Sequence, residues 1–178
     1  WEDGDFSEKS FINRTNSDLS NNFGNLIQRV IKFSNKNFEN KFPNDINTKM
    51  DDFYLIELGY ALYQKVENKM ISFQFSKALE IIWNFISKLN QYIDKMEPWK
   101  LIKTNKEKSA LVLSIVIENI RIIAILTQPF IPDSSKKILD MLNVDIDKRH
   151  FKYLNIKNSL KKNAIINEPV QIFPRYNE

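Results

Sequence analysis

An amide and a guanidinium stand four residues apart in the chain, at Asn25 and Arg29. On a helix this spacing places both side chains on the same face, one turn apart. Amide and guanidinium groups hydrogen-bond base edges and phosphates, so the pair is a candidate contact for a nucleic acid. From the residues alone, the simpler interpretation is a solvated polar face, or Arg29 paired with an acidic neighbour.

A second candidate is the Pro98-Trp99 dipeptide, which lies within MEPWKLIK directly after an expected helix end. A tryptophan held on a loop by a rigid proline offers a stacking platform for an unpaired base. The flanking lysines, Lys95, Lys100 and Lys103, fit an RNA partner. The alternative is a tryptophan that folds back as a hydrophobic lid on the core, which is the commoner arrangement in general.

No other residue pattern indicates catalysis or metal binding. The 178 residues include no cysteine and a single histidine, His150, which excludes thiol chemistry and leaves too few ligands for a Cys- or His-based metal site. No glycine-rich phosphate loop and no paired carboxylates in an active-site setting occur. We therefore expect no catalytic residue, metal or cofactor in this chain. The net charge of +4 permits a nucleic-acid partner but does not require one.

Apolar residues recur at spacings of three and four, which predicts the helices that position these candidates. Asn25 and Arg29 fall on a helix over 17–38, preceded by a short lead-in with Ser7 as a candidate N-cap. Pro98 ends a helix over 73–96. The remaining helices are expected over 51–70, 104–128 and 134–142.

The helix over 104–128 is apolar nearly all round, which is typical of a helix surrounded by others. Thr104 and Glu107 fit a capping box at its start. Its densest apolar stretch is interrupted by Glu118, Asn119 and Arg121, so we expect no membrane span.

These elements predict an all-α fold, an antiparallel bundle of four to five helices over residues 1–143. Gly24 lies inside the first long helix, where it weakens the helix by roughly 1 kcal/mol relative to alanine, so we expect it to serve a close helix contact. Residues 144–178 lose the periodicity and form an irregular C-terminal extension. Apolar residues there, such as Phe151, Ile165, Ile166 and Phe173, have no local period that would bury them, so we expect the extension to pack on another domain.

Three segments carry a more specific signal. They are FINRTNSDLSNNFGNLIQR, ALEIIWNFISKLNQYIDKMEPWKL and IENIRIIAILTQPFIP, at 11–29, 78–101 and 117–132. In this order and with these separations, they resemble the anticodon-binding domain of methionyl-tRNA synthetase, a class I aminoacyl-tRNA synthetase. The resemblance covers about residues 5–143. The closing VQIFPR resembles the short terminal segment of many bacterial members, which implies a return towards a catalytic domain.

The resemblance implies that Asn25, Arg29 and Trp99 contact the CAU anticodon loop of tRNA(Met), with Trp99 stacked on the wobble cytosine and Pro98 fixing its loop. It also implies a cytoplasmic parent enzyme that attaches methionine to tRNA with ATP and Mg²⁺ in an N-terminal catalytic domain. The HIGH-like and KMSKS-like segments of that domain are missing here, so the chain alone is expected to be non-catalytic.

Two alternatives stay open at this point. One is the equivalent bundle of another class I synthetase for a hydrophobic amino acid, which shares variants of the Asn25–Arg29 motif. The other is a helical protein-interaction module without RNA function.

Overall fold

The computed structural model describes residues 7–176, and its first helical segment is longer than the sequence predicts. Ser7 is the N-cap, since its side chain accepts a hydrogen bond from the Ser10 N–H at 3.4 Å. A continuous helix follows in three parts: α1 (Glu8–Arg14), a π-helical segment η1 (Thr15–Gly24) and α2 (Asn25–Phe38). The expected lead-in, residues 1–16, is therefore helical from Glu8 onward, and its first six residues lie outside the described part of the chain. A π-helix breaks the 3.6-residue period, and α1 buries no residue, so no apolar stripe revealed this part.

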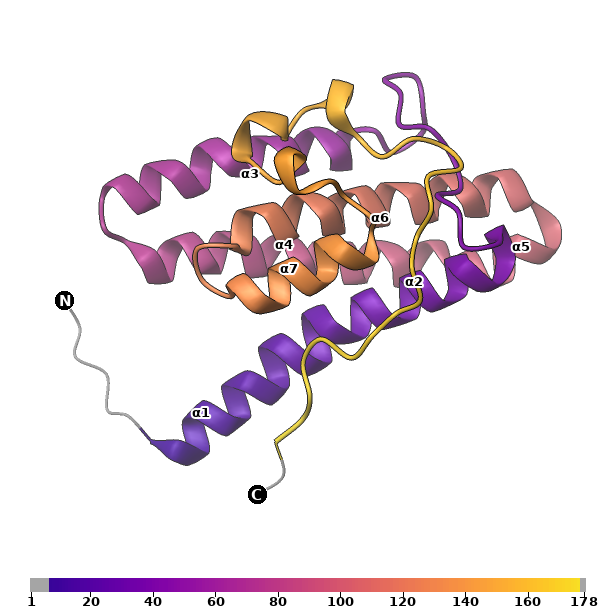
Figure 1. Ribbon diagram of the computed structural model, residues 1–178. Coiled ribbons are helices and arrows are strands. Elements are labelled where there is room, and N and C mark those ends of the chain that lie inside the picture. Colours follow the sequence, from indigo (N-terminus) through magenta and orange to yellow (C-terminus); the bar gives the residue numbers. More distant parts are fainter. Residues whose placement is uncertain (1–6, 177–178) are drawn as a thin grey trace.

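Except for the short α5, which the sequence did not predict, the remaining helices follow the prediction closely, and successive long helices reverse direction (Figure 1). This confirms the all-α bundle. Their bounds are α3 Tyr54–Ile71, α4 Phe75–Met96, α5 Pro98–Thr104, α6 Lys106–Thr127 and α7 Pro132–Met141.

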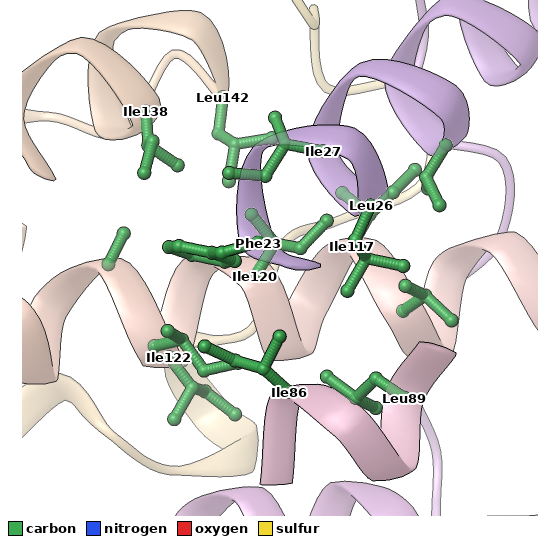
Figure 2. Packing of buried hydrophobic residues seen from close by; sticks show 14 of the residues in the cluster. Phe23, Leu26, Ile27, Ile86, Leu89, Ile117, Ile120, Ile122, Ile138 and Leu142 are labelled. Carbon is green, nitrogen blue, oxygen red and sulfur yellow. The ribbon is translucent and has the colours of Figure 1, made fainter. Parts of the chain in front are cut away.

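Helix α6 is the centre of the bundle. By length and composition it could cross a membrane, contrary to our expectation, but 94% of its apolar window is buried inside the fold. Figure 2 shows how Phe23, Leu26 and Ile27 cover it from the first helical segment. Side chains of α4, of α7 and of Leu142, which directly follows α7, complete this core, including Ile86, Leu89 and Ile138.

The capping box predicted at Thr104 is wrong. Thr104 is the last residue of α5, and its hydroxyl donates to the carbonyl oxygen of Leu101 at 3.4 Å. Asn105 caps α6 instead, because its side chain accepts the N–H of Lys108 at 2.9 Å. The sequence analysis placed the cap one residue too early because it did not detect α5. This helix is seven residues long and too short to show a period.

The C-terminal extension packs on the bundle itself. Three short 3₁₀ helices, Ile146–Lys148, Phe151–Tyr153 and Ile156–Asn158, precede an extended run. Ile166 and Phe173 are 1% and 8% exposed, so the expectation that they need another domain to bury them is wrong, whereas Ile165 is 59% exposed. Long-range contacts bury Ile166 and Phe173, and a local period is not required.

The last part of the extension, residues 167–176, is the C-terminal strap, which runs back along α2 and η1 (Figure 1). Four side chains of the first helical segment bind its carbonyl oxygens: Asn35 to Asn167 at 3.1 Å, Gln28 to Val170 at 2.5 Å, Ser20 to Phe173 at 3.3 Å and Asn16 to Tyr176 at 2.9 Å.

Gly24 lies against the strap. A Cβ there would lie 3.2 Å from the Phe173 ring, so the close contact expected for Gly24 is made with the strap and not with another helix.

Gly59 of α3 lies close against α6. A Cβ at this position would lie 2.1 Å from Asn119 Oδ1 and 3.1 Å from Ile122 Cδ1.

We expect Gly59→Ala to lower the free energy of unfolding by about 1–3 kcal/mol, because the two helices must move apart. Urea denaturation of the chain measures this. Ala61→Ser, at an exposed site on the same helix, is the control and should change stability by less than about 0.5 kcal/mol. Equal stability of the Gly59→Ala and parent chains would show that the crossing has room for a methyl group.

Candidate nucleic-acid interface

Arg29 and Trp99, which are far apart in the sequence, lie together at one side of the bundle. The guanidinium carbon of Arg29 lies 5.1 Å from the centroid of the Trp99 ring, a cation–π distance. Arg29 Nη2 also pairs with Asp94 Oδ1 of α4 at 2.7 Å. The acidic neighbour that the sequence left open as an alternative is therefore present, and it holds the guanidinium beside the indole.

Trp99 lies in the first turn of a helix, so its expected position on a loop is wrong. Glu97 ends α4 in the left-handed conformation at φ 44, and Pro98 then occupies the first position of α5. The Pro98 carbonyl accepts a hydrogen bond from the buried Ser109 hydroxyl of α6 at 3.0 Å, which fixes the start of α5 on the central helix. Trp99 is half-buried and packs against the core with part of its side chain.

Asn25 lies one turn before Arg29 and is exposed. Its side chain makes no hydrogen bond to any residue within 7–176. The structure therefore brings Arg29, Pro98 and Trp99 together and leaves the Asn25 amide free beside them.

Two lysines extend this face and were missed in the sequence. Lys32 and Lys36 follow Arg29 by three and seven residues, so with Asn25 they form one polar row, the α2 stripe (Asn25, Arg29, Lys32 and Lys36). Both lysines are exposed, and neither is ion-paired with another described residue. The signal was present, because the same helical spacing continues past Arg29. The α2 stripe gives the face a positive charge that suits a phosphate backbone.

A network of short polar side chains fixes α4 against η1 next to this face. Asn90 Nδ2 donates to Asn22 Oδ1 at 2.7 Å, and Asn22 Nδ2 donates to Ser87 Oγ at 3.1 Å. Tyr92 anchors the same helix from the other side, since its hydroxyl donates to Asp52 Oδ2 at 3.0 Å. Burial and the neighbouring Asp52 raise the pKa of Tyr92, so it remains a donor at any physiological pH. These contacts set the position of Asp94, and through it that of Arg29.

Within the described residues, no three His, Cys, Asp or Glu side chains are grouped so that they could hold a metal ion. What the face offers is an amide, a guanidinium, an indole and ammonium groups. These are the groups with which proteins contact unpaired bases and phosphates.

The fold and this face define a helical domain with the groups for contacting RNA on one side. Residues 42–178 match the family described as the anticodon binding domain of methionyl tRNA ligase, and residues 1–31 match class I tRNA synthetases (M). The chain belongs to the family of anticodon-binding domains of methionyl-tRNA ligases. This confirms the resemblance inferred from the three segments.

Individual relatives agree with the family. The chain is 38% identical to the methionine–tRNA ligase of Rickettsia felis over 98% of its own length, and 38% identical to that of Fusobacterium nucleatum over 97%. The crystal structure of free-state Mycobacterium tuberculosis methionyl-tRNA synthetase superimposes with a TM-score of 0.92 at 31% identity, covering 99% of this chain. The chain spans only 35%, 28% and 36% of these three proteins.

Proposed function

We propose that this chain recognises the CAU anticodon loop of tRNA(Met) within a methionine–tRNA ligase. The observation that carries the proposal is the contact of Arg29 with Trp99, beside the free amide of Asn25. In this proposal the Trp99 ring stacks on the wobble cytosine. Arg29 and Asn25 hydrogen-bond the edges of the neighbouring bases, and Pro98 holds the turn that presents the ring.

The ion pair of Arg29 with Asp94 suits this role. The two side chains are 33% and 59% exposed, and an ion pair this accessible to water contributes about 0–1 kcal/mol. The guanidinium is therefore held in place before RNA arrives, but it can exchange the carboxylate for a base or phosphate at little cost. Lys32 and Lys36 follow on the same face and contact the backbone of the loop, which adds affinity without selecting a sequence.

The parent enzyme of this proposal attaches methionine to tRNA with ATP and Mg²⁺ in the cytoplasm. A second structure of the Mycobacterium tuberculosis synthetase, which is bound by methionyl-adenylate, supports this, because this chain aligns to it with a TM-score of 0.88 at 30% identity. The chain then forms a bundle domain over 1–143 with an extension that leads towards the catalytic domain. Ile146 and Ile165 of the extension, 82% and 59% exposed, remain free for that contact.

Binding of anticodon stem-loop RNAs to the chain tests the proposal. We expect the CAU loop to bind more tightly than loops with one anticodon base changed, by about 1–3 kcal/mol for each base, because each change removes a stack or a base-edge contact. Fluorescence anisotropy measured with labelled RNA provides the dissociation constants.

The two alternatives predict other results. The equivalent domain of a synthetase for another hydrophobic amino acid would prefer a different anticodon. A helical interaction module without RNA function would bind all the loops equally weakly, with no dependence on Asn25, Arg29 or Trp99.

A further inference from the structure

The exposed face of α2 has two sides. On one side, Arg29 turns to Asp94 and Trp99. On the other side, the Gln28 amide donates to the Val170 carbonyl of the C-terminal strap at 2.5 Å. Asn25 lies between these two sides on the helix surface, so the strap borders the candidate anticodon site opposite Trp99.

A hollow of about 530 Å³ lies between the helix and the strap. Asn21, Asn25 and Gln28 line it from the helix, and Gln171 and Arg175 line it from the strap. Its lining includes no Asp or Glu. Three side-chain amides from the helix, one amide from the strap and a guanidinium therefore face one space that borders Asn25.

The contacts that bury the strap come from residues other than Gln171 and Arg175. Ser20 and Gln28 bind its backbone carbonyls, and Phe173 is buried 6.0 Å from the ring centroid of Phe23. Gln171 is exposed and makes no hydrogen bond within the described residues. Arg175 is exposed and reaches back over the helix, where its guanidinium donates to Asn21 Oδ1.

The chemistry of the hollow suits an unpaired nucleobase with its phosphate. Side-chain amides both donate and accept, so Asn25 and Gln171 can match the edge of a base from two directions. A guanidinium binds a phosphate with two parallel hydrogen bonds. The volume falls within the range of small-ligand sites.

We infer that this hollow takes an unpaired base of the bound RNA, with Gln171 contacting its edge and Arg175 its phosphate. The inference rests on the proposed function and deepens it, because it makes the strap the second wall of the RNA site. Sequence reasoning placed all the RNA contacts on the bundle and assigned none to the extension.

Gln171→Ala and Arg175→Ala in the 178-residue chain test the inference. We expect each change to weaken binding of the CAU anticodon stem-loop about five- to a hundredfold. The melting temperature should change little, because both side chains are exposed and Arg175 makes only an exposed hydrogen bond to Asn21. Glu168→Ala is the matched control, because Glu168 is exposed on the same strap and does not line the hollow. Its binding should equal that of the parent chain.

Gln171→Glu separates RNA contact from packing. The two side chains have the same shape, so a structural role leaves binding intact, whereas a contact with RNA is lost because a carboxylate cannot donate and repels phosphate. Parent-like binding by both Gln171→Glu and Arg175→Ala overturns the inference.

The same measurement on Trp99→Ala separates the two proposals. If only Trp99→Ala loses preference for CAU, the strap inference fails alone. If the parent chain shows no such preference, the proposed function fails with it.

Discussion

Replacing Trp99 by alanine is expected to reduce tRNA charging by the intact ligase about five- to over a hundredfold while leaving methionyl-adenylate formation nearly unchanged. Loss of one base–aromatic stack costs about 1–3 kcal/mol, which gives this range. The structure adds a second effect, because the Arg29 guanidinium packs over the same ring at 5.1 Å. Removing the indole frees Arg29 from one of its two supports, so contacts made by Arg29 weaken as well.

Trp99 also packs against the core, so its role in recognition must be separated from a role in stability. We would measure the melting temperature and the charging kinetics on one preparation, with tRNAs carrying CAU and altered anticodons. Trp99→Phe keeps a stacking ring and should recover much of the charging that Trp99→Ala loses. If Trp99→Ala melts far earlier, or still discriminates CAU as well as the parent, the indole serves packing only.

Lys36→Ala provides a contrast to Trp99→Ala. Lys36 is exposed on the α2 stripe two turns beyond Arg29, and a phosphate contact there carries no base information. Binding should weaken equally for every anticodon, and the slope of log affinity against log salt concentration should fall by about 1. A loss restricted to CAU would move Lys36 into the base-reading group.

Arg121→Met is expected to lower the free energy of unfolding by about 3–5 kcal/mol, because it leaves the buried carboxylate of Glu118 without its cation. Glu118 and Arg121 are 0% and 2% exposed in the middle of α6, with Arg121 Nη2 2.7 Å from Glu118 Oε1. Burial lowers the pKa of Arg121, but the charge and hydrogen bonds of Glu118 together with Tyr60 raise it above its ordinary value, so the guanidinium stays charged. Urea denaturation measures the loss.

The same carboxylate joins three parts of the fold. The Tyr60 hydroxyl of α3 donates to Glu118 Oε1 at 2.9 Å, and the Leu160 N–H of the extension donates to Oε2 at 3.0 Å. Glu118→Gln combined with Arg121→Met removes the lone charge. The amide oxygen can still accept from the Leu160 N–H, and the Tyr60 hydroxyl can accept from the amide NH2. The double variant should therefore be more stable than Arg121→Met alone. A loss below about 1 kcal/mol in Arg121→Met would show that water reaches Glu118 and solvates it.

The helices of the bundle could be predicted from the sequence because each long helix has its own apolar face. α3, α4 and α7 begin and end within three residues of the predicted bounds, since a period of 3.6 needs only local spacing. The part of the first helical segment before residue 17, which includes α1, and the seven-residue α5 could not be predicted in this way. α1 buries no residue that would reveal an apolar stripe, and α5 is too short to establish a period.

The residues of the candidate site that depend on local spacing could also be predicted, and those that depend on tertiary packing could not. The spacing of Asn25 and Arg29 shows that they share a helix face, but no local rule brings Trp99 to Arg29 or selects Asp94 as its partner. Those contacts depend on how α2, α4 and α5 pack. The resemblance to a family grouped Trp99 with Arg29, and nothing in the sequence pointed to Asp94. Gln171 and Arg175 lie in a segment without periodicity, so their place beside Asn25 emerges only from the tertiary fold.

The strap also sets an order of events during synthesis on the ribosome. Asn16 and Tyr176 exchange two hydrogen bonds across a separation of 160 residues, at 2.9 and 3.0 Å. At typical elongation rates the first helix emerges on the order of ten seconds before its last partner. Until then η1 and α2 lack the cover that the strap provides, and Phe23 lacks the ring of Phe173. The nascent chain must therefore keep its first helix soluble, or shielded by a chaperone, until translation of this segment is complete.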